Sequence, residues 1–148
     1  MRLTEHFTVE ELQKSEAATR HGVPNICPPE LAGNMLIVAD HLELIREHYG
    51  VPVRVLSCYR SPEVNKLVGG SETSAHRFAL AADFEVDGVS NHDVATWCAE
   101  NISDYDQIIN EFPPDGWVHI GFTGKTPRKQ LLTAVKTNGK TVYNQGIA

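Results

Sequence analysis

Three side chains that could hold a metal ion stand in two short stretches of the sequence. His76 and Asp83 lie in the segment SAHRFALAAD (residues 74–83), and His119 lies in the segment WVH (residues 117–119). Neutral imidazoles together with a carboxylate are common ligands of catalytic zinc, which keeps a fourth position open for water. The sequence therefore offers a candidate zinc site made of two histidines and one aspartate.

Two of these residues are expected to face the same side of a β-sheet. Around Asp83 the apolar residues Ala82 and Phe84 alternate with acidic ones, which is typical of a strand with one buried face. Around His119 the buried side of a second strand is marked by Val118, Ile120 and Phe122. Because successive side chains of a strand point to opposite faces, Asp83 and His119 can both turn away from the core toward a cleft.

Two acidic residues near His119 could act as a general base, which takes a proton from water and passes it to the leaving amine. Glu111 ends one strand of a predicted hairpin whose other strand carries His119, so both side chains can face one cleft. Asp115 precedes Gly116, and an Asp-Gly pair suits the turn between the two strands. We therefore expect Glu111 to be the base, with Asp115 as the second candidate.

Hydrophobic spacing and turn residues predict the elements that position these side chains. A capping box formed by Thr8 and Glu11 begins a helix that should end near Gly22, and the pair Asn138-Gly139 predicts a hairpin. We expect a single α+β domain over residues 1–148, with a mostly antiparallel sheet and flanking helices. The predicted helices cover residues 8–22, 28–50, 61–69 and 90–101. The first predicted strand begins at residue 53 and runs into residues 57–60, and the others cover residues 82–86, 108–109, 118–122, 131–137 and 140–144.

The composition fits one ordinary globular domain and argues against several other classes. The chain has 148 residues, of which 41% are hydrophobic and 22% charged. Its formal net charge of −6 disfavours a nucleic-acid partner, which binds a basic surface. The cysteines form no CxxC pair, so neither a disulfide framework nor a thiolate zinc site is indicated. The first residues lack the apolar run of a signal peptide, and no run could span a membrane, so we expect synthesis in the cytoplasm.

Four stretches of the sequence together carry a family resemblance. SAHRFALAAD and WVH, with SCYRSPEVN at residues 57–65 and EHFTVEEL at residues 5–12, resemble the M15 family of zinc D-Ala-D-Ala carboxypeptidases and L-alanyl-D-glutamate endopeptidases. The resemblance runs from about residue 4 to residue 122 and implies the fold shared by hedgehog signalling domains and DD-peptidases. Cys58 and Ala79 stand where the family has glycine, and alanine is a poor substitute if residue 79 needs a positive φ.

The resemblance implies a role for each candidate residue. It implies that zinc is bound by His76, Asp83 and His119. It also implies Glu111 as the catalytic base and substrate binding by Arg60, Ser74 and Trp117. Arg60 is similar to an arginine that holds a substrate carboxylate, although a helix-start ion pair with Glu63 explains it equally well. The expected substrate is a peptidoglycan stem peptide. We expect the enzyme to be a monomer that binds neither nucleic acid nor a membrane.

Alternatives exist for the single residues and for the whole protein. Taken one at a time, His76 could cap a loop, Asp83 could be a solvated strand acid, and His119 could be a hydrogen-bonded sheet histidine. Within matching motifs the metal site is favoured. The alternative function is a non-catalytic, zinc-containing module that binds the cell wall; a structural metal is less favoured, because such sites close with a fourth protein ligand. Likeness to short phage endolysin-like members implies a phage or prophage lysis enzyme that reaches the wall through a separate pore.

Overall fold

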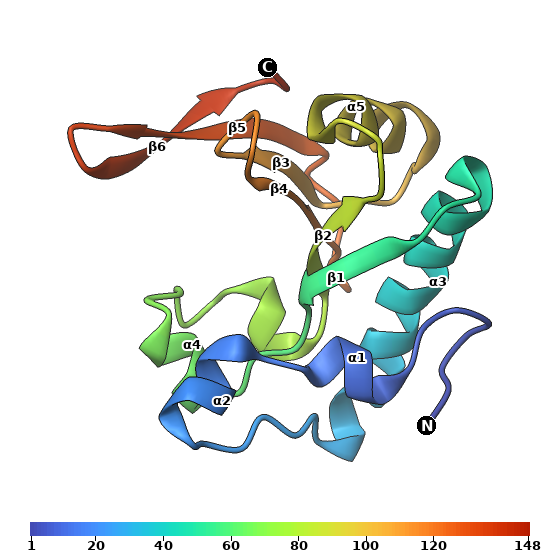
Figure 1. Ribbon diagram of the computed structural model, residues 1–148, viewed down its shortest axis with the longest axis vertical. Helices are drawn as coiled ribbons and strands as arrows, with labels where there is room; N and C mark the ends of the chain where they lie inside the picture. The colour runs from blue at the N-terminus through green and yellow to red at the C-terminus, as the bar shows by residue number, and fades with distance from the viewer.

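A six-stranded sheet forms the centre of the molecule, in the strand order β1-β2-β4-β3-β5-β6 (Figure 1). The computed structural model describes residues 1–148. All neighbouring strands are antiparallel except β3 and β5, which run parallel. The predicted α+β fold with a mostly antiparallel sheet is therefore confirmed. The strands are β1 (Val53–Ser57), β2 (Ala81–Val86), β3 (Gln107–Glu111), β4 (Trp117–Gly121), β5 (Gln130–Thr137) and β6 (Lys140–Gln145).

Helices α3 and α5 pack against the sheet and enclose the main core. Apolar residues at helical spacing on α3 meet the inward side chains of the strands, and both sets are almost fully buried. Each large side chain buried in this way stabilises the fold by about 1.5–3 kcal/mol. None of the helices has the length and apolar character needed to cross a lipid bilayer. The helices are α1 (Val9–Gln13), α2 (Glu16–His21), η1 (Pro29–Leu31), α3 (Ala32–Tyr49), α4 (Pro62–Leu67), η2 (Ala75–Phe78) and α5 (Asn91–Asn101).

The predicted single helix from Thr8 to Gly22 is wrong, because the chain breaks into α1 and α2. Thr8 caps α1 as expected, accepting a hydrogen bond from the Glu11 backbone N–H. Lys14 then takes an extended conformation, and the Ser15 side chain caps α2 as a second helix start. Gly22 ends α2 with a φ of 64°, in the left-handed conformation common at helix ends.

Long-range hydrogen bonds explain why the first helix stops early. The Leu12 carbonyl accepts from the Tyr59 N–H at 3.0 Å, and the Gln13 carbonyl accepts from the Asn25 side chain at 2.7 Å. These carbonyls would otherwise lack a partner at the end of α1. Asn25 also donates to the Tyr59 carbonyl and accepts from the Ser61 N–H. The break thus ties the amino-terminal helices to the segment that carries Arg60.

The remaining predicted elements are present. Gly50 ends α3 with a φ of 67°, while Ser61 and Ser90 cap α4 and α5 through their side chains. Asn138 and Gly139 have φ values of 52° and 78°, and this pair of positive φ angles matches the tight turn that twists a hairpin correctly. The resulting β5–β6 hairpin extends away from the body of the molecule (Figure 1).

Candidate active site

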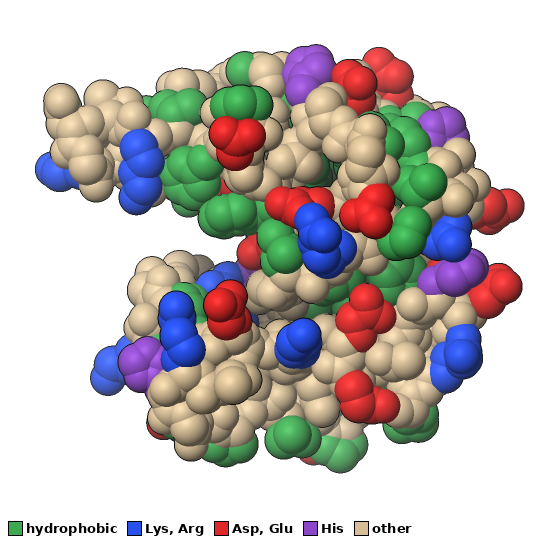
Figure 2. Space-filling model, viewed as in Figure 1, with side chains coloured by type: hydrophobic (Ala, Val, Ile, Leu, Met, Phe, Trp, Pro, Cys, Tyr) green, Lys and Arg blue, Asp and Glu red, His purple; other side chains and the backbone are tan.

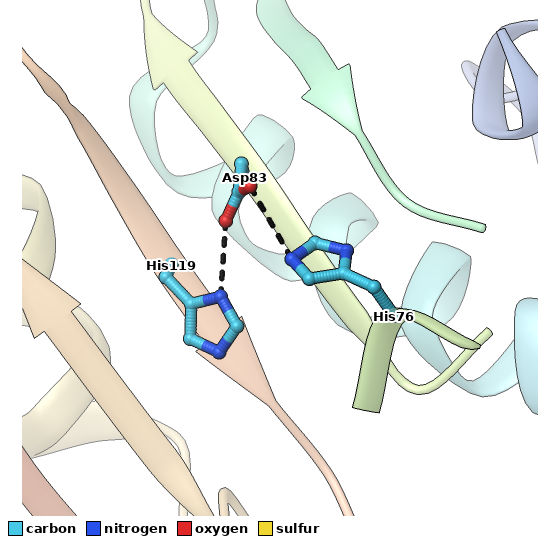
Figure 3. A group of neighbouring side chains, drawn as sticks. All are labelled: His76, Asp83 and His119. Carbon is cyan, nitrogen blue, oxygen red and sulfur yellow. Dashed lines mark hydrogen bonds and ion pairs between the residues drawn. The ribbon is translucent and has the colours of Figure 1, made fainter. Parts of the chain in front are cut away.

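His76, Asp83 and His119 come together on the open face of the sheet, although each belongs to a different element. Asp83 on β2 and His119 on β4 are direct partners across the two antiparallel strands, and His76 lies on η2. One Asp83 oxygen lies 3.0 Å from His119 Nδ1, and the other lies 3.3 Å from His76 Nε2 (Figure 3). The three ligand atoms lie within 4.8 Å of one another, close enough for one ion to contact all three.

The chain around His76 fixes the orientation of its imidazole ring. His76 Nδ1 lies 2.7 Å from the Cys58 carbonyl oxygen, so this nitrogen carries the proton and donates it. Nε2 faces Asp83, and it is the nitrogen that can bind a metal when Nδ1 holds the proton of the neutral ring. The His76 backbone carbonyl accepts a hydrogen bond from the Arg60 N–H at 3.0 Å, and the His76 backbone N–H donates to the Ser74 hydroxyl at 3.3 Å.

Ala79 ends the turn that presents His76. Its φ is 56°, so the position does require the left-handed conformation in which glycine is favoured. An L-residue other than glycine costs about 1–2 kcal/mol in this conformation. The Ala79 side chain is fully buried in the main core, and burial of its methyl group stabilises the fold by about 0.8 kcal/mol. Alanine therefore keeps the turn at a small net cost.

The electrostatics of the three residues fit a divalent cation. Burial by itself would raise the pKa of Asp83, but the adjacent imidazoles of His76 and His119 outweigh it and hold that pKa well below its usual range. The carboxylate is therefore charged, and it sits between two ring nitrogens that can offer lone pairs. Two imidazoles and one carboxylate leave one coordination position for water, which is the donor set of a catalytic zinc site.

A cleft opens above these residues, between the β5–β6 hairpin and the lobe that carries α4 (Figure 2). Its volume is about 1140 Å³. The sequence-predicted residues that line it are His76, Asp83, His119, Arg60, Ser74, Glu111 and Trp117. Asp115 is absent from the lining and is exposed on the turn between β3 and β4.

Glu111 has the protonation behaviour expected of a general base. Burial, followed by the negative charge of Asp83, raises its pKa to about 7. The positive charges of His119 and Arg60 oppose this shift without cancelling it. The Trp117 indole N–H also favours the charged carboxylate, although it does not complete a hydrogen bond with any acceptor. A carboxyl with a pKa near neutrality can both accept and return a proton at physiological pH.

The turn after Glu111 explains why Asp115 stands apart. Gly116 packs so closely that a side chain there would bring its first carbon within 1.7 Å of the Glu111 carbonyl oxygen. Only glycine fits, and the Gly116 N–H bonds to the Phe112 carbonyl at 3.0 Å. The Asp-Gly pair therefore serves the turn that holds Glu111 in place.

Arg60 lies in the cleft and makes no ion pair with Glu63, so the helix-start ion pair is not formed. Its Nη2 donates to the Ser74 hydroxyl at a long 3.5 Å, and its Nε is buried without a partner. Burial lowers the pKa of the guanidinium, while the carboxylates of Asp83 and Glu111 raise it. The side chain therefore has donors free for an anionic group in the cleft.

Sequence reasoning missed part of the cleft wall. Phe112, Thr141 and Tyr143 line the cleft, yet none was singled out. The hairpin that carries Thr141 and Tyr143 was predicted, but its position depends on the parallel pairing of β5 with β3. Local sequence patterns carry no signal for such a pairing between distant segments.

A second group of possible metal ligands was also missed. His6 Nδ1 lies 2.9 Å from a Glu43 oxygen, and Glu5 is close to both. His6 and Glu5 are exposed, and such surface clusters commonly exist without an ion. This group therefore carries no functional argument.

The raised pKa of Glu111 predicts a stability effect in the metal-free protein. The unfolded chain loses this proton near the ordinary pKa of 4.5, whereas the folded chain keeps it until about 7. Folding stability should therefore fall as pH rises through this interval, and the deficit is complete above it. Glu111→Gln removes the titration, so the variant should be more stable than the original at about pH 8, by up to about 3 kcal/mol. Urea unfolding should show this advantage shrinking by about pH 4.5, where both side chains are neutral; a constant difference would contradict the burial argument.

Comparison with known proteins agrees with the geometry. The model of the family Peptidase M15 matches residues 5–121, a span that includes all three candidate ligands, Glu111 and Arg60. No curated protein matches the chain. Peptidases of this family are generally zinc-dependent, and the two histidines and the aspartate provide suitable ligands. The family model covers most of the chain, including the three candidate metal ligands, so the protein belongs to the Peptidase M15 family and is a peptidase.

Proposed function

We propose that the protein is a zinc-dependent peptidase that hydrolyses peptide bonds in the stem peptides of peptidoglycan. The bond cut is of the D-Ala-D-Ala carboxypeptidase or the L-alanyl-D-glutamate endopeptidase type. One observation carries the proposal: Glu111, with a pKa raised to about 7, lines the same cleft as His76, Asp83 and His119. A structural metal site would need neither a base nor an open cleft beside it.

The side chains of the cleft divide the chemistry among them. Zinc held by His76, Asp83 and His119 would supply Lewis acidity at the scissile carbonyl. Glu111 takes the proton from the attacking water and afterwards delivers it to the leaving amine. Arg60 binds a substrate carboxylate through its planar pair of donors and so fixes the peptide in register with the base. Ser74 and Trp117 line the wall along which the peptide lies.

A digest of purified peptidoglycan with the zinc-loaded protein, followed by mass spectrometry, tests this proposal. Loss of terminal D-Ala and cleavage after L-Ala leave products of different mass, so the experiment also identifies the bond. Unchanged masses, combined with sedimentation of the protein with the wall, would favour the alternative of a non-catalytic wall-binding module. The presence of Glu111 in the cleft supports the enzyme over that alternative.

The biological setting proposed for this activity is cell lysis during phage or prophage release. The likeness of residues 5–12 to short endolysin-like members supports it. In this setting the protein acts as a monomer and reaches the wall through a separate pore. Co-expression with and without a pore-forming protein tests the route, because lysis should require both.

Arg60→Lys is expected to raise KM while leaving the fold and the zinc content unchanged. Lysine keeps the positive charge but loses the two-pronged geometry that binds a carboxylate, so an increase in KM of about tenfold is expected. Steady-state kinetics on a stem peptide, with zinc measured in the same preparation, provide the check. Kinetics identical to the original enzyme would assign Arg60 to holding the His76 loop through its backbone.

A further inference from the structure

The β5–β6 hairpin forms one wall of the cleft, although it lies outside the part of the chain that matches the family model. That match ends at residue 121, and the hairpin begins at Gln130. Thr141 and Tyr143 on β6 line the cleft opposite the lobe that carries α4. The space between hairpin and lobe is visible as the deep notch in the molecular surface (Figure 2).

The strand register places Tyr143 in line with the candidate base. Trp117 pairs with Glu111, Glu111 pairs with Ala134, and Ala134 pairs with Tyr143. Directly paired residues of neighbouring strands project from the same face of a sheet. Tyr143 and Glu111 therefore project from the cleft face, two strands apart, with the buried side chain of Ala134 between them.

A small apolar cluster holds the base of the hairpin against the sheet. Ile109, Leu132 and Ala134 are buried together, and Phe112 packs against them. The Phe112 ring makes an edge contact with Trp117 at a centroid distance of 5.6 Å, within the usual range for aromatic pairs. These contacts place the rings of Phe112 and Trp117 beside the base of the hairpin that carries Tyr143.

The side chain of Tyr143 is unusually free for an aromatic residue in a cleft. It is 55% exposed, so much of its ring can still be buried by a ligand. Burial of the remainder raises the pKa of the phenol, and the negative charges of Glu111 and Asp83 act in the same direction. The phenol therefore stays neutral and lies within the field of both carboxylates. With Phe112 and Trp117, which line the same cleft, its ring offers an apolar surface to an uncharged segment of a ligand.

We propose that Phe112, Trp117 and Tyr143 form an aromatic subsite for an uncharged segment of the substrate on one side of the scissile bond. Tyr143, carried by the hairpin, supplies the wall of this subsite through its ring. Arg60, which lines the same cleft, binds the substrate carboxylate. The inference rests on the proposed function, because it names the substrate segment that the same cleft binds.

Kinetics of Tyr143→Ala, Tyr143→Phe and Val142→Ala test the subsite. Val142 is the matched control, because it neighbours Tyr143 on β6 and projects from the opposite face. Each enzyme is assayed on a stem peptide and on two versions extended by two uncharged residues at one end or the other. Tyr143→Ala should raise KM for one extended peptide about tenfold or more, with kcat changed far less. Tyr143→Phe should stay close to the original enzyme, because it keeps the ring.

The outcomes separate the subsite from the proposed function. Extension at one end should lower KM in the original enzyme and in Val142→Ala, and this gain should vanish in Tyr143→Ala, while zinc content stays the same in all three. An original enzyme that cleaves the peptides, with equal KM values for Tyr143→Ala and Val142→Ala, would overturn the subsite alone. Tyr143→Phe as weak as Tyr143→Ala would overturn the ring contact. An original enzyme that cleaves none of the peptides would overturn the proposed function and the subsite with it.

Discussion

Replacing Glu111 with glutamine is expected to lower the turnover number about 10²–10⁴-fold while zinc remains bound, which is the usual contribution of a positioned general base. Glutamine has nearly the same shape but cannot accept the proton of the attacking water. Its effect should appear in kcat and in kcat/KM together, because the lost interaction forms only in the transition state. Steady-state kinetics with zinc measured in the same sample provide the test.

Asp115→Asn is the matched control for this experiment. Asp115 is exposed on the turn, and asparagine suits the position before Gly116 as well as aspartate does. We expect its turnover to lie within about twofold of the original, in line with the small effects of exposed substitutions. A zinc-loaded but inactive Asp115→Asn enzyme, beside an active Glu111→Gln enzyme, would transfer the role of base to the turn.

Replacing Asp83 with asparagine is expected to abolish both zinc binding and activity. The original protein should hold one zinc per chain, because the three ligands converge on a single point. Asparagine removes the only negative charge of that cluster and leaves two imidazoles, which is too few for a zinc site. Metal analysis after dialysis should find almost no zinc, and the zinc-dependent rise in melting temperature should vanish with it.

Glu85→Gln controls for the loss of an acidic group on the same strand. Glu85 stands two positions along β2 on the face of Asp83, but it pairs with Arg54 away from the metal cluster. Its replacement should leave zinc content and activity unchanged, since a partly exposed ion pair contributes at most about 1 kcal/mol. If Asp83→Asn still bound one zinc per chain, the ligand assignment would have to be abandoned.

Much of the arrangement of the three candidate metal ligands could be predicted from sequence because its causes are local. Strand alternation places Asp83 and His119 on one face, and the register then makes them direct partners. The third candidate ligand, His76, was predicted from the motif in which it stands. Residue 79 does have the positive φ that the sequence analysis raised only as a condition, and Ala79 adopts it with its methyl group buried.

The features that escaped prediction depend on contacts between distant segments. The first helix breaks because Leu12 and Gln13 find hydrogen-bond partners in Tyr59 and Asn25, which no local pattern reveals. The pKa of Glu111 depends first on its burial and then on Asp83, so it could not be foreseen from chain position. The hairpin reaches the cleft only because β5 joins β3 in parallel.

That parallel pairing also has a consequence for the behaviour of the protein in concentrated solution. Without β5, the backbone of β3 would present a row of unpaired N–H and C=O groups beside the apolar side chain of Ile109, a template for association with other chains. β5 pairs with these backbone groups, and β6 is then the strand at the edge of the sheet. All residues of β6 are exposed, and Lys140 at the start of this strand opposes the addition of another strand by charge repulsion. The hairpin therefore protects the strand of the candidate base from aggregation as well as framing the cleft.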